Sequence, residues 1–409
     1  MMKIIYITNS RIPTEKAHGF QVMKMSEAFS NYRSGSTQIK TDQRGNDFQR
    51  ESAPNPHKSA SIDVELWIPG RFNQIKENPF SYYNIRETFS IKKIPVIDLI
   101  PLYKFFGAFA NFVESISFAI FSYFKLPKGD DYTIYSRDQF ILWFLSFTKK
   151  KFVYEMHSFP GKPIFYKRIW KRAHKIITIT SALKAKIVET GISESKISVA
   201  HDAVDLDDFN AVAQGKEELK IELGLPKDDF LIGYIGKFKT LGMEKGIATM
   251  IEALPLLDKE MKMVFVGGEE SEIKEYKSFA NRFNVVYQCL FFDYQPYARL
   301  IRYTKAMDVL IIPFPNKPHY AFYASPLKLF EYMASGRPII SSDLPALREV
   351  LNDKNALFFK PDDAADLARS IKMLKSSQML GYHLSQQALA DVKQYTWHNR
   401  ARKILEFIK

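Results

Sequence analysis

Apolar positions in the first half of the chain alternate between the spacing of a buried strand and the spacing of a helix. Residues Lys3–Thr8 form an almost wholly apolar run, and Val22, Met25 and Phe29 then recur at helical spacing. Further strands are predicted at Asp63–Ile68, Tyr132–Tyr135, Lys151–Glu155 and Lys175–Thr180, with helices over 21–32, 99–126, 139–147 and 164–173. Strands that alternate with helices in this way build a doubly wound parallel sheet.

The alternation restarts after a polar stretch at 206–215, which has the composition of a linker. Strands are predicted at Phe230–Ile235, Lys262–Val266, Asp308–Ile312 and Pro338–Ser341, with helices over 246–257 and 271–283 and another that opens at Ser325 and Pro326. The sequence therefore predicts an α/β protein of two domains, residues 1–205 and 216–393. Ligands of such sheets bind beyond the carboxyl ends of the strands, here in a cleft between the domains.

Two segments of the first domain depart from this pattern. Residues 33–61 hold one Ile and one Phe and no periodicity, which predicts a disordered insertion. Residues 99–126 are rich in aromatics but too interrupted by polar residues to span a membrane. We expect a core helix there; the alternative is a helix that rests on anionic lipid, with Lys104 and Lys125 at its ends.

The net charge and the cysteine content indicate which partners and which cellular compartment to expect. The net charge of +13 favours polyanionic partners, although a basic surface also serves solubility alone. Cys289 is the single cysteine, so an intramolecular disulfide framework is excluded. The first residues turn polar after a short apolar run, which predicts a strand and not a signal peptide. We expect a cytoplasmic protein.

Lysines and glycines follow the first strand of the second domain. Lys237 and Lys245 lie among Gly236, Gly242 and Gly246, just before a predicted helix. Two ammonium groups near a helix N-terminus suit two adjacent phosphates, although a solvated lysine pair is the alternative. The spacing is not that of a Walker loop.

The predicted helix at 326–333 has a cation, Lys328, and an anion, Glu331, near its beginning. Ser325, the free N–H of Leu327 and the charge of Lys328 suit a pyrophosphate, and Glu331 can accept hydrogen bonds from ribose hydroxyls. The alternative is an intrahelical ion pair between Lys328 and Glu331.

The first domain offers His157 after one strand and Gly19 after another. His157 would face the same cleft and steady charge on a sugar. The chain has no G-x-G-x-x-G, no H-E-x-x-H and no Cys/His cluster, so neither a metal nor a nicotinamide site is expected. Asp205-x-Asp207 matches a short metal-binding motif of sugar transferases, but its place in the linker makes coincidence the better interpretation.

Taken together, these segments resemble the retaining glycosyltransferases of family 4, which have the GT-B fold of two Rossmann-like domains. The resemblance rests on "SPLKLFEYMASGRPIISSDLPALREVL", "GYIGKFKTLGMEKGI", "VYEMHSF", "AHDAVDLDDF" and "YTWHNRARKILEFI". It implies that residues 394–409 form a helix that crosses back to the first domain. It also implies a nucleotide-diphosphate sugar as donor, with no metal or other cofactor.

The resemblance assigns a role to each candidate. Lys237 and Lys245 would neutralise the diphosphate, with Ser325, Leu327 and Lys328 adding contacts to it. Gly236 and Gly19 would let backbone approach the phosphates. Glu331 would hold the ribose, and His157 would contact the sugar. The family carries a Glu eight positions before Glu331, where this chain has Tyr323.

The predicted function is a retaining hexosyl transfer to a glycan, lipid-linked or small-molecule acceptor, in cell-surface polysaccharide or glycolipid synthesis. An anionic membrane surface, on the inner face of the cell membrane, is a further predicted partner, and nucleic acid is not. The enzyme alternatives are a GT-B-type epimerase and a phosphorylase. The non-enzyme alternative is a basic protein that binds anions or a membrane. The cations argue against it, because they follow the predicted strands and do not form one basic stripe.

Overall fold

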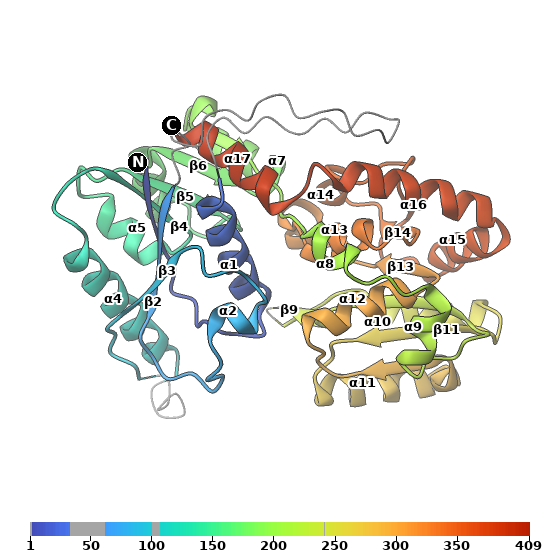
Figure 1. Cartoon of the computed structure of the whole chain (residues 1–409). Helices are drawn as coiled ribbons and strands as arrows, with labels where there is room; N and C mark the ends of the chain where they lie inside the picture. The colour runs from blue at the N-terminus through green and yellow to red at the C-terminus, as the bar shows by residue number, and fades with distance from the viewer. Residues whose placement is uncertain (1, 33–61, 100–106, 241) are drawn as a thin grey trace, which may run out of the picture.

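The structure is a computed structural model that describes residues 2–32, 62–99, 107–240 and 242–409. It contains two α/β domains, each built on a parallel sheet (Figure 1). The predicted disordered insertion at 33–61 lies outside the described residues.

The first sheet has seven parallel strands in the order β3-β2-β1-β4-β5-β6-β7. Its strands are β1 (Lys3–Ile7), β2 (Asp63–Pro69), β3 (Ser90–Ile94), β4 (Tyr132–Ser136), β5 (Phe152–Met156), β6 (Lys175–Thr178) and β7 (Ile197–Val199). Its helices are α1 (Ala17–Ser30), α2 (Pro79–Tyr82), α4 (Ala108–Lys125), α5 (Gln139–Leu145), α6 (Ile164–Arg172) and α7 (Ser181–Glu189).

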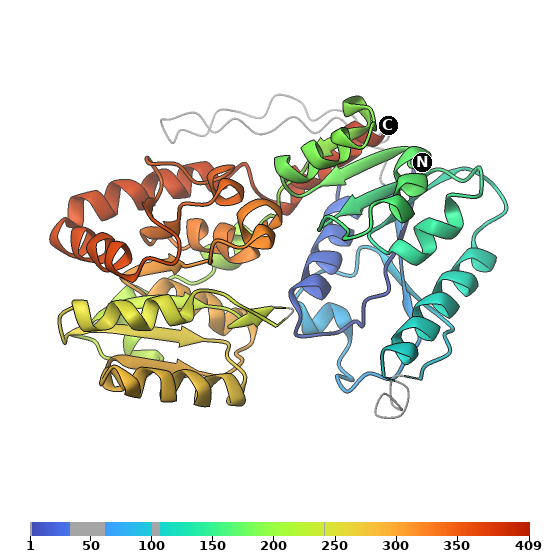
Figure 2. The ribbon, with the colours of Figure 1, turned by 180° about the vertical axis from the view of Figure 1, so that it is seen from behind.

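Helices cover both faces of this sheet. On one face α4, α5, α6 and α7 bury their apolar sides in one cluster with Ile5, Ile7 and Trp67. On the other face α1 packs beside α17 (Trp397–Ile408), the last helix of the chain, as Figure 2 shows from behind. The C-terminal helix therefore contributes to the core of the N-terminal domain.

The second sheet has six parallel strands in the order β12-β11-β8-β13-β14-β15. Its strands are β8 (Phe230–Ile235), β11 (Met261–Val266), β12 (Cys289–Phe292), β13 (Val309–Ile312), β14 (Ile339–Ser342) and β15 (Leu357–Phe359), with a small hairpin of β9 (Lys239–Thr240) and β10 (Met243–Glu244). The helices are α8 (Leu206–Asn210), α9 (Lys216–Glu222), α10 (Ile247–Ala253), α11 (Glu270–Arg282), α12 (Tyr297–Ala306), α13 (Leu327–Ala334), α14 (Pro345–Arg348), α15 (Ala364–Ser376) and α16 (Gln378–Val392).

Besides the short β9–β10 hairpin, the sequence misses four described strands of the two large sheets, and all four are edge strands. β3 and β7 border the first sheet, and β12 and β15 border the second. Edge strands are short and half-exposed, so they lack the continuous apolar run that marks a central strand of a parallel sheet. The predicted linker at 206–215 is partly helical, since α8 occupies its first half.

Loops at the carboxyl ends of the two sheets meet. The hydroxyl of Thr180, after β6, donates to the carbonyl of Phe322 at 2.9 Å. Both carboxylate oxygens of Glu349 accept from the N–H of Ser181, at 2.8 and 2.9 Å. Among the residues that the structure describes, no helix is both long and apolar enough to cross a bilayer.

Candidate active site

Three of the predicted phosphate-binding groups converge at the carboxyl end of β8. A Cβ added to Gly236, which has φ +126°, would lie 3.2 Å from the Nζ of Lys328. Lys328 comes from the first turn of α13, and Lys245 follows the β9–β10 hairpin. A side chain at Gly236 would therefore push against the ammonium that the site presents.

Lys328 is the most constrained of these cations. Its side chain is 8% exposed, and its Nζ lies 3.4 Å from the ring centroid of Tyr234. That Nζ has no hydrogen-bond partner among the described residues. Burial, reinforced by the charge of Lys245, lowers the pKa of Lys328 well below its usual range. A buried ammonium without a hydrogen-bond acceptor is costly, so the arrangement favours an anionic ligand.

Lys245 and Glu331 have shifted pKa values as well. Burial, together with the nearby charge of Lys237, lowers the pKa of Lys245 to about 8. Burial raises the pKa of Glu331 to about 7, against the opposing effect of Lys328. Along the described part of the chain no ion pair joins Lys328 to Glu331, so the intrahelical pair that rivalled the ligand-binding interpretation does not form.

Ser325 and Leu327 contact the first domain. The Oγ of Ser325 accepts the N–H of Asp202 at 3.0 Å, and Leu327 packs against the apolar cluster around α1. The beginning of α13 is thus held between the domains, where its first N–H groups have no partner within the helix.

Gly19 has a packing role that the sequence did not reveal. It is the third residue of α1, and a Cβ there would lie 2.4 Å from the hydroxyl oxygen of Tyr83. That hydroxyl accepts the N–H of Thr14 at 2.7 Å and donates to its carbonyl at 2.9 Å. Close packing against Tyr83 is therefore sufficient to require glycine.

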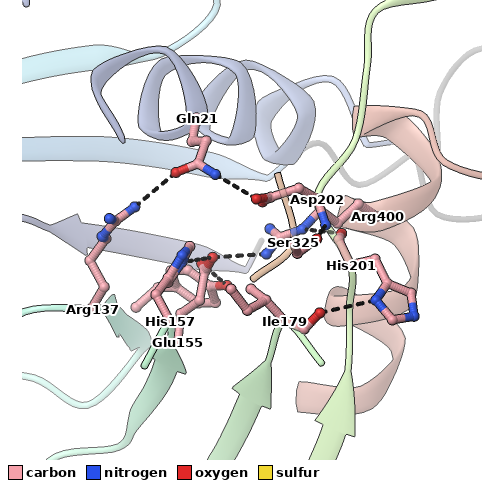
Figure 3. A network of polar contacts seen from close by, with 10 residues as sticks. Gln21, Arg137, Glu155, His157, Ile179, His201, Asp202, Ser325 and Arg400 are labelled. Atoms are coloured by element: carbon pink, nitrogen blue, oxygen red, sulfur yellow. Dashed lines mark hydrogen bonds and ion pairs between the residues drawn. The ribbon is translucent and has the colours of Figure 1, made fainter. Parts of the chain in front are cut away.

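His157 lies beyond β5 in a buried polar network (Figure 3). Its Nε2 lies 2.7 Å from the Oε1 of Glu155, which also accepts from Arg400 of α17 at 2.8 Å. Burial, with Arg137 next in effect, lowers the pKa of His157 to about 4, so the ring is neutral at pH 7. A neutral ring that donates from Nε2 to Glu155 keeps Nδ1 as an acceptor.

The sequence reasoning missed several polar residues around His157. Arg137 donates to Gln21 at 3.3 Å, and Gln21 donates to Asp202 at 2.7 Å (Figure 3). His18 has its pKa lowered to about 4, first by burial and then by Arg137. Arg137 directly follows β4, so the rule that ligand groups follow strands was able to find it; Gln21 and Asp202 come together only through the tertiary fold.

Tyr323 closes a π-helical turn, η5 (His319–Tyr323), which follows β13. Its side chain packs against the core of the first domain. At the beginning of the turn, burial and the nearby Lys245 lower the pKa of His319. π-Helical turns are frequent at functional sites, and this one stands where the resemblance leads one to expect a sugar-binding Glu.

The acidic motif at 205–207 has a structural role. Asp205 accepts the N–H of Asp207 at 3.1 Å, as the cap of α8, and pairs with the buried Lys24 at 2.8 Å.

Comparisons with known proteins agree with this arrangement. Residues 229–377 match the family model described as Glycosyl transferases group 1. The chain is 26% identical over 224 residues to a D-inositol 3-phosphate glycosyltransferase of Xylanimonas cellulosilytica, covering 53% of this chain and 52% of that protein. It is 24% identical over 261 residues to TuaC of Bacillus subtilis, a putative teichuronic acid biosynthesis glycosyltransferase, covering 64% and 62%. The matches thus span about half to three-fifths of these relatives.

The fold comparison extends over the whole chain. The crystal structure of Anabaena Alr3699/HepE in complex with UDP superposes with a TM-score of 0.68 at 14% identity, covering 99% of this chain and 98% of that one. The two parallel-sheet domains are therefore a GT-B fold.

Proposed function

We propose that this protein is a retaining, metal-independent glycosyltransferase that moves a sugar from a nucleoside-diphosphate sugar to an acceptor. The buried, unpartnered Nζ of Lys328 beside Lys245 carries the proposal, because it is a cationic site in need of an anion. The match of residues 229–377 to a glycosyltransferase family model, and the GT-B relative solved with UDP, support the choice of a nucleotide sugar as that anion.

The chemistry requires stabilisation of the departing nucleoside diphosphate. Lys237, Lys245 and Lys328 supply positive charge to it, and the N–H groups at the beginning of α13 add donors. Glu331 accepts from the ribose hydroxyls. The acceptor hydroxyl attacks the face of the sugar from which the diphosphate departs, and a phosphate oxygen takes the acceptor's proton. The neutral His157 contacts the sugar through its Nδ1, because its Nε2 is bonded to Glu155.

The acceptor binds the first domain in this proposal. A cavity of about 310 Å³ lies in the loops after β1 and β2, with Arg11 and Arg71 among its lining residues. Because the strands are parallel, these loops lie at the same edge of the sheet as His157, which follows β5. A glycan or lipid-linked acceptor there would place the protein in cell-surface polysaccharide or glycolipid synthesis.

The outer helices of the first domain are suited to a membrane surface. Phe112 and Phe124 of α4 and Trp143 of α5 are exposed, Phe124 by 77%. Lys125 and Lys128 lie at the end of α4. Exposed aromatics next to lysines are typical of a surface that rests on anionic lipid, which supports a peripheral, cytoplasmic-face location.

Substitution at the donor site tests the proposal. Lys245→Ala and Glu331→Ala should each reduce sugar transfer by at least about 10²-fold, the scale of one lost transition-state contact. The measurement is turnover of a donor that a thermal-shift screen of sugar nucleotides selects, and Lys274→Ala on the exposed face of α11 is the matched control. Near-wild-type turnover of both variants would refute the site. Conversion of the sugar nucleotide alone to an epimer, or phosphate acting as acceptor, would favour the epimerase or the phosphorylase.

A further inference from the structure

A second basic cavity lies at the opposite ends of the strands that lead to His157. It has a volume of about 330 Å³ and lies at the amino ends of β5, β6 and β7, beside the C-terminal end of α17. Its lining residues are Lys149, Lys150, Lys151, Lys171, Arg172, Ala173, His174 and Lys196. Nothing in the proposed sugar transfer uses this pocket.

The charge of this pocket is almost uncompensated. Six of the eight lining residues are Lys or Arg, and none is Asp or Glu. The nearest carboxylate in the described ion pairs is that of Asp130, 3.0 Å from the Nζ of Lys150, and its side chain is 85% exposed. Residues 139–172 hold eight Lys and Arg against one acid, Glu155, which is buried and paired with Arg400.

Four of the six cations are anchored on backbone carbonyls. Lys196 donates to the carbonyls of Lys171 and Ala173, at 2.9 and 3.1 Å. Lys150 and Lys151 donate to carbonyls at Gly129 and Ile408, and Arg172 donates to that of Thr148. The carbonyls of Lys171, Ala173 and Ile408 lie at the ends of α6 and α17, where cations are favoured, which explains the positions of Lys196 and Lys151. The carbonyls that Lys150 and Arg172 contact belong to the loops after α4 and α5.

Lys149 and Lys171 are the two cations of the pocket that contact no carbonyl in the described structure. Both are exposed, and neither Nζ has a hydrogen-bond partner within the described ranges of the chain. They project from a floor of anchored cations, where mutual repulsion would favour spreading unless an anion joined them.

We propose that this pocket binds a phosphate ester, with the exposed Lys149 and Lys171 as donors and the anchored cations as its floor. The group is either a soluble phosphate ester or the headgroup of an anionic phospholipid. The neighbouring Phe147 is 56% exposed and lies 3.8 Å from the guanidinium of Arg168, so an apolar and cationic rim adjoins the pocket. The inference stands apart from the proposed sugar transfer, because it uses the other end of the sheet.

A pair of double variants of the full chain tests the site. Lys149→Ala/Lys171→Ala removes the two free cations, and Lys274→Ala/Lys277→Ala removes two exposed lysines of α11 as the matched control. Glycerol 3-phosphate is titrated by calorimetry, and vesicles of phosphatidylcholine with and without phosphatidic acid are used in sedimentation. Lys245→Ala serves as a second control, since it affects only the donor site.

The proposal expects binding to at least one probe, weakened at least about tenfold in the pocket variant and unchanged in both controls. Binding of glycerol 3-phosphate would identify a soluble ester as sufficient, and binding of the acidic vesicles alone would identify the headgroup. Equal binding by the pocket variant and the wild type, equal loss in the α11 control, or no binding of either probe would overturn it.

Discussion

Burial of charged side chains without a mutual ion pair distinguishes the proposed donor site. Lys328 and Glu331 lie one turn apart in α13. Burial lowers the pKa of Lys328 and raises that of Glu331, so it favours the neutral form of each side chain. A ligand that offers oxyanions to the lysine and hydroxyls to the glutamate would relieve both costs. The buried Lys24 contrasts with this site, because its Nζ lies 2.8 Å from a carboxylate oxygen of Asp205 and 3.4 Å from one of Asp208.

The pKa of Lys245 leads to a pH prediction. In the free protein its pKa is about 8, so the side chain is charged at pH 7 and neutral at pH 9. A bound diphosphate favours the charged form, so binding should take up protons near pH 8 and weaken by up to about tenfold for each further pH unit. Calorimetry of the selected nucleoside diphosphate, in buffers of different ionisation enthalpy, measures both effects. The Lys245→Ala variant should lose most of this dependence, and a flat affinity of the wild type from pH 7 to 9 would contradict it.

Lys328 leads to a prediction on stability. Its folded-state pKa lies below the ordinary lysine value, so its burial opposes folding at neutral pH, and the penalty falls as pH rises past the folded pKa. Lys328→Met keeps the packing on Tyr234 and removes the charge. We expect the melting temperature to rise by about 2–4 °C for each kcal/mol recovered, while nucleotide affinity falls at least about tenfold. Thermal unfolding and calorimetry on the same samples measure both, and a destabilised variant that still binds would contradict the assignment.

At the level of residues, the sequence predicted groups that follow strands and missed groups brought in from elsewhere. The proposed roles of Lys237 and Lys245 follow from the sequence alone, because both lysines lie among glycines just after β8. The contribution of Arg400 was not, because it lies 245 residues from Glu155 and meets it only when α17 docks. Gly19 shows that a glycine near a predicted site can have another cause. Its lack of a side chain is explained by close packing against Tyr83.

At the level of elements, α17 links the end of the chain to the residue that orients His157. The side chain of Arg400 is 3% exposed and donates to the carboxylate of Glu155 and to the carbonyl of His201. Arg400→Met should leave the buried carboxylate of Glu155 without its cationic partner, and breaking a buried ion pair in this way typically costs about 3–5 kcal/mol. Denaturant unfolding measures the loss. Adding Glu155→Gln should restore part of it, and a double variant no more stable than Arg400→Met would show that the cost has another source.

The central strands were predictable because strands buried on both faces of a parallel sheet are continuous apolar runs. The edge strands were not: β3, with the sequence SIKKI, carries two lysines, and β7 has three residues. Pairing with a neighbouring strand defines them, and that information lies in the tertiary fold.

At the level of the whole molecule, the domains meet through few polar contacts. The carboxylate of Glu349 in the second domain accepts from the N–H and the hydroxyl of Ser181 in the first. The Nε2 of His201 lies 3.6 Å from the same carboxylate. One acidic side chain therefore carries much of the polar contact between the carboxyl ends of the two sheets.

Removal of that side chain should loosen the arrangement of the domains. Hydrogen bonds to a charged group contribute roughly 1.5–3 kcal/mol, so Glu349→Ala should lower the equilibrium constant for this arrangement of the domains by about tenfold or more. Small-angle scattering of the ligand-free protein should then show a larger radius of gyration. In the proposed transfer His157 and the lysines of the second domain contact one substrate, so the transfer rate should fall as well. Asp353→Ala is the matched control, since that exposed acid pairs with Arg348 of its own domain. If Glu349→Ala leaves both the scattering profile and the rate as in the wild type, the domains are held together by their apolar contacts, such as that of Phe20 with Tyr297.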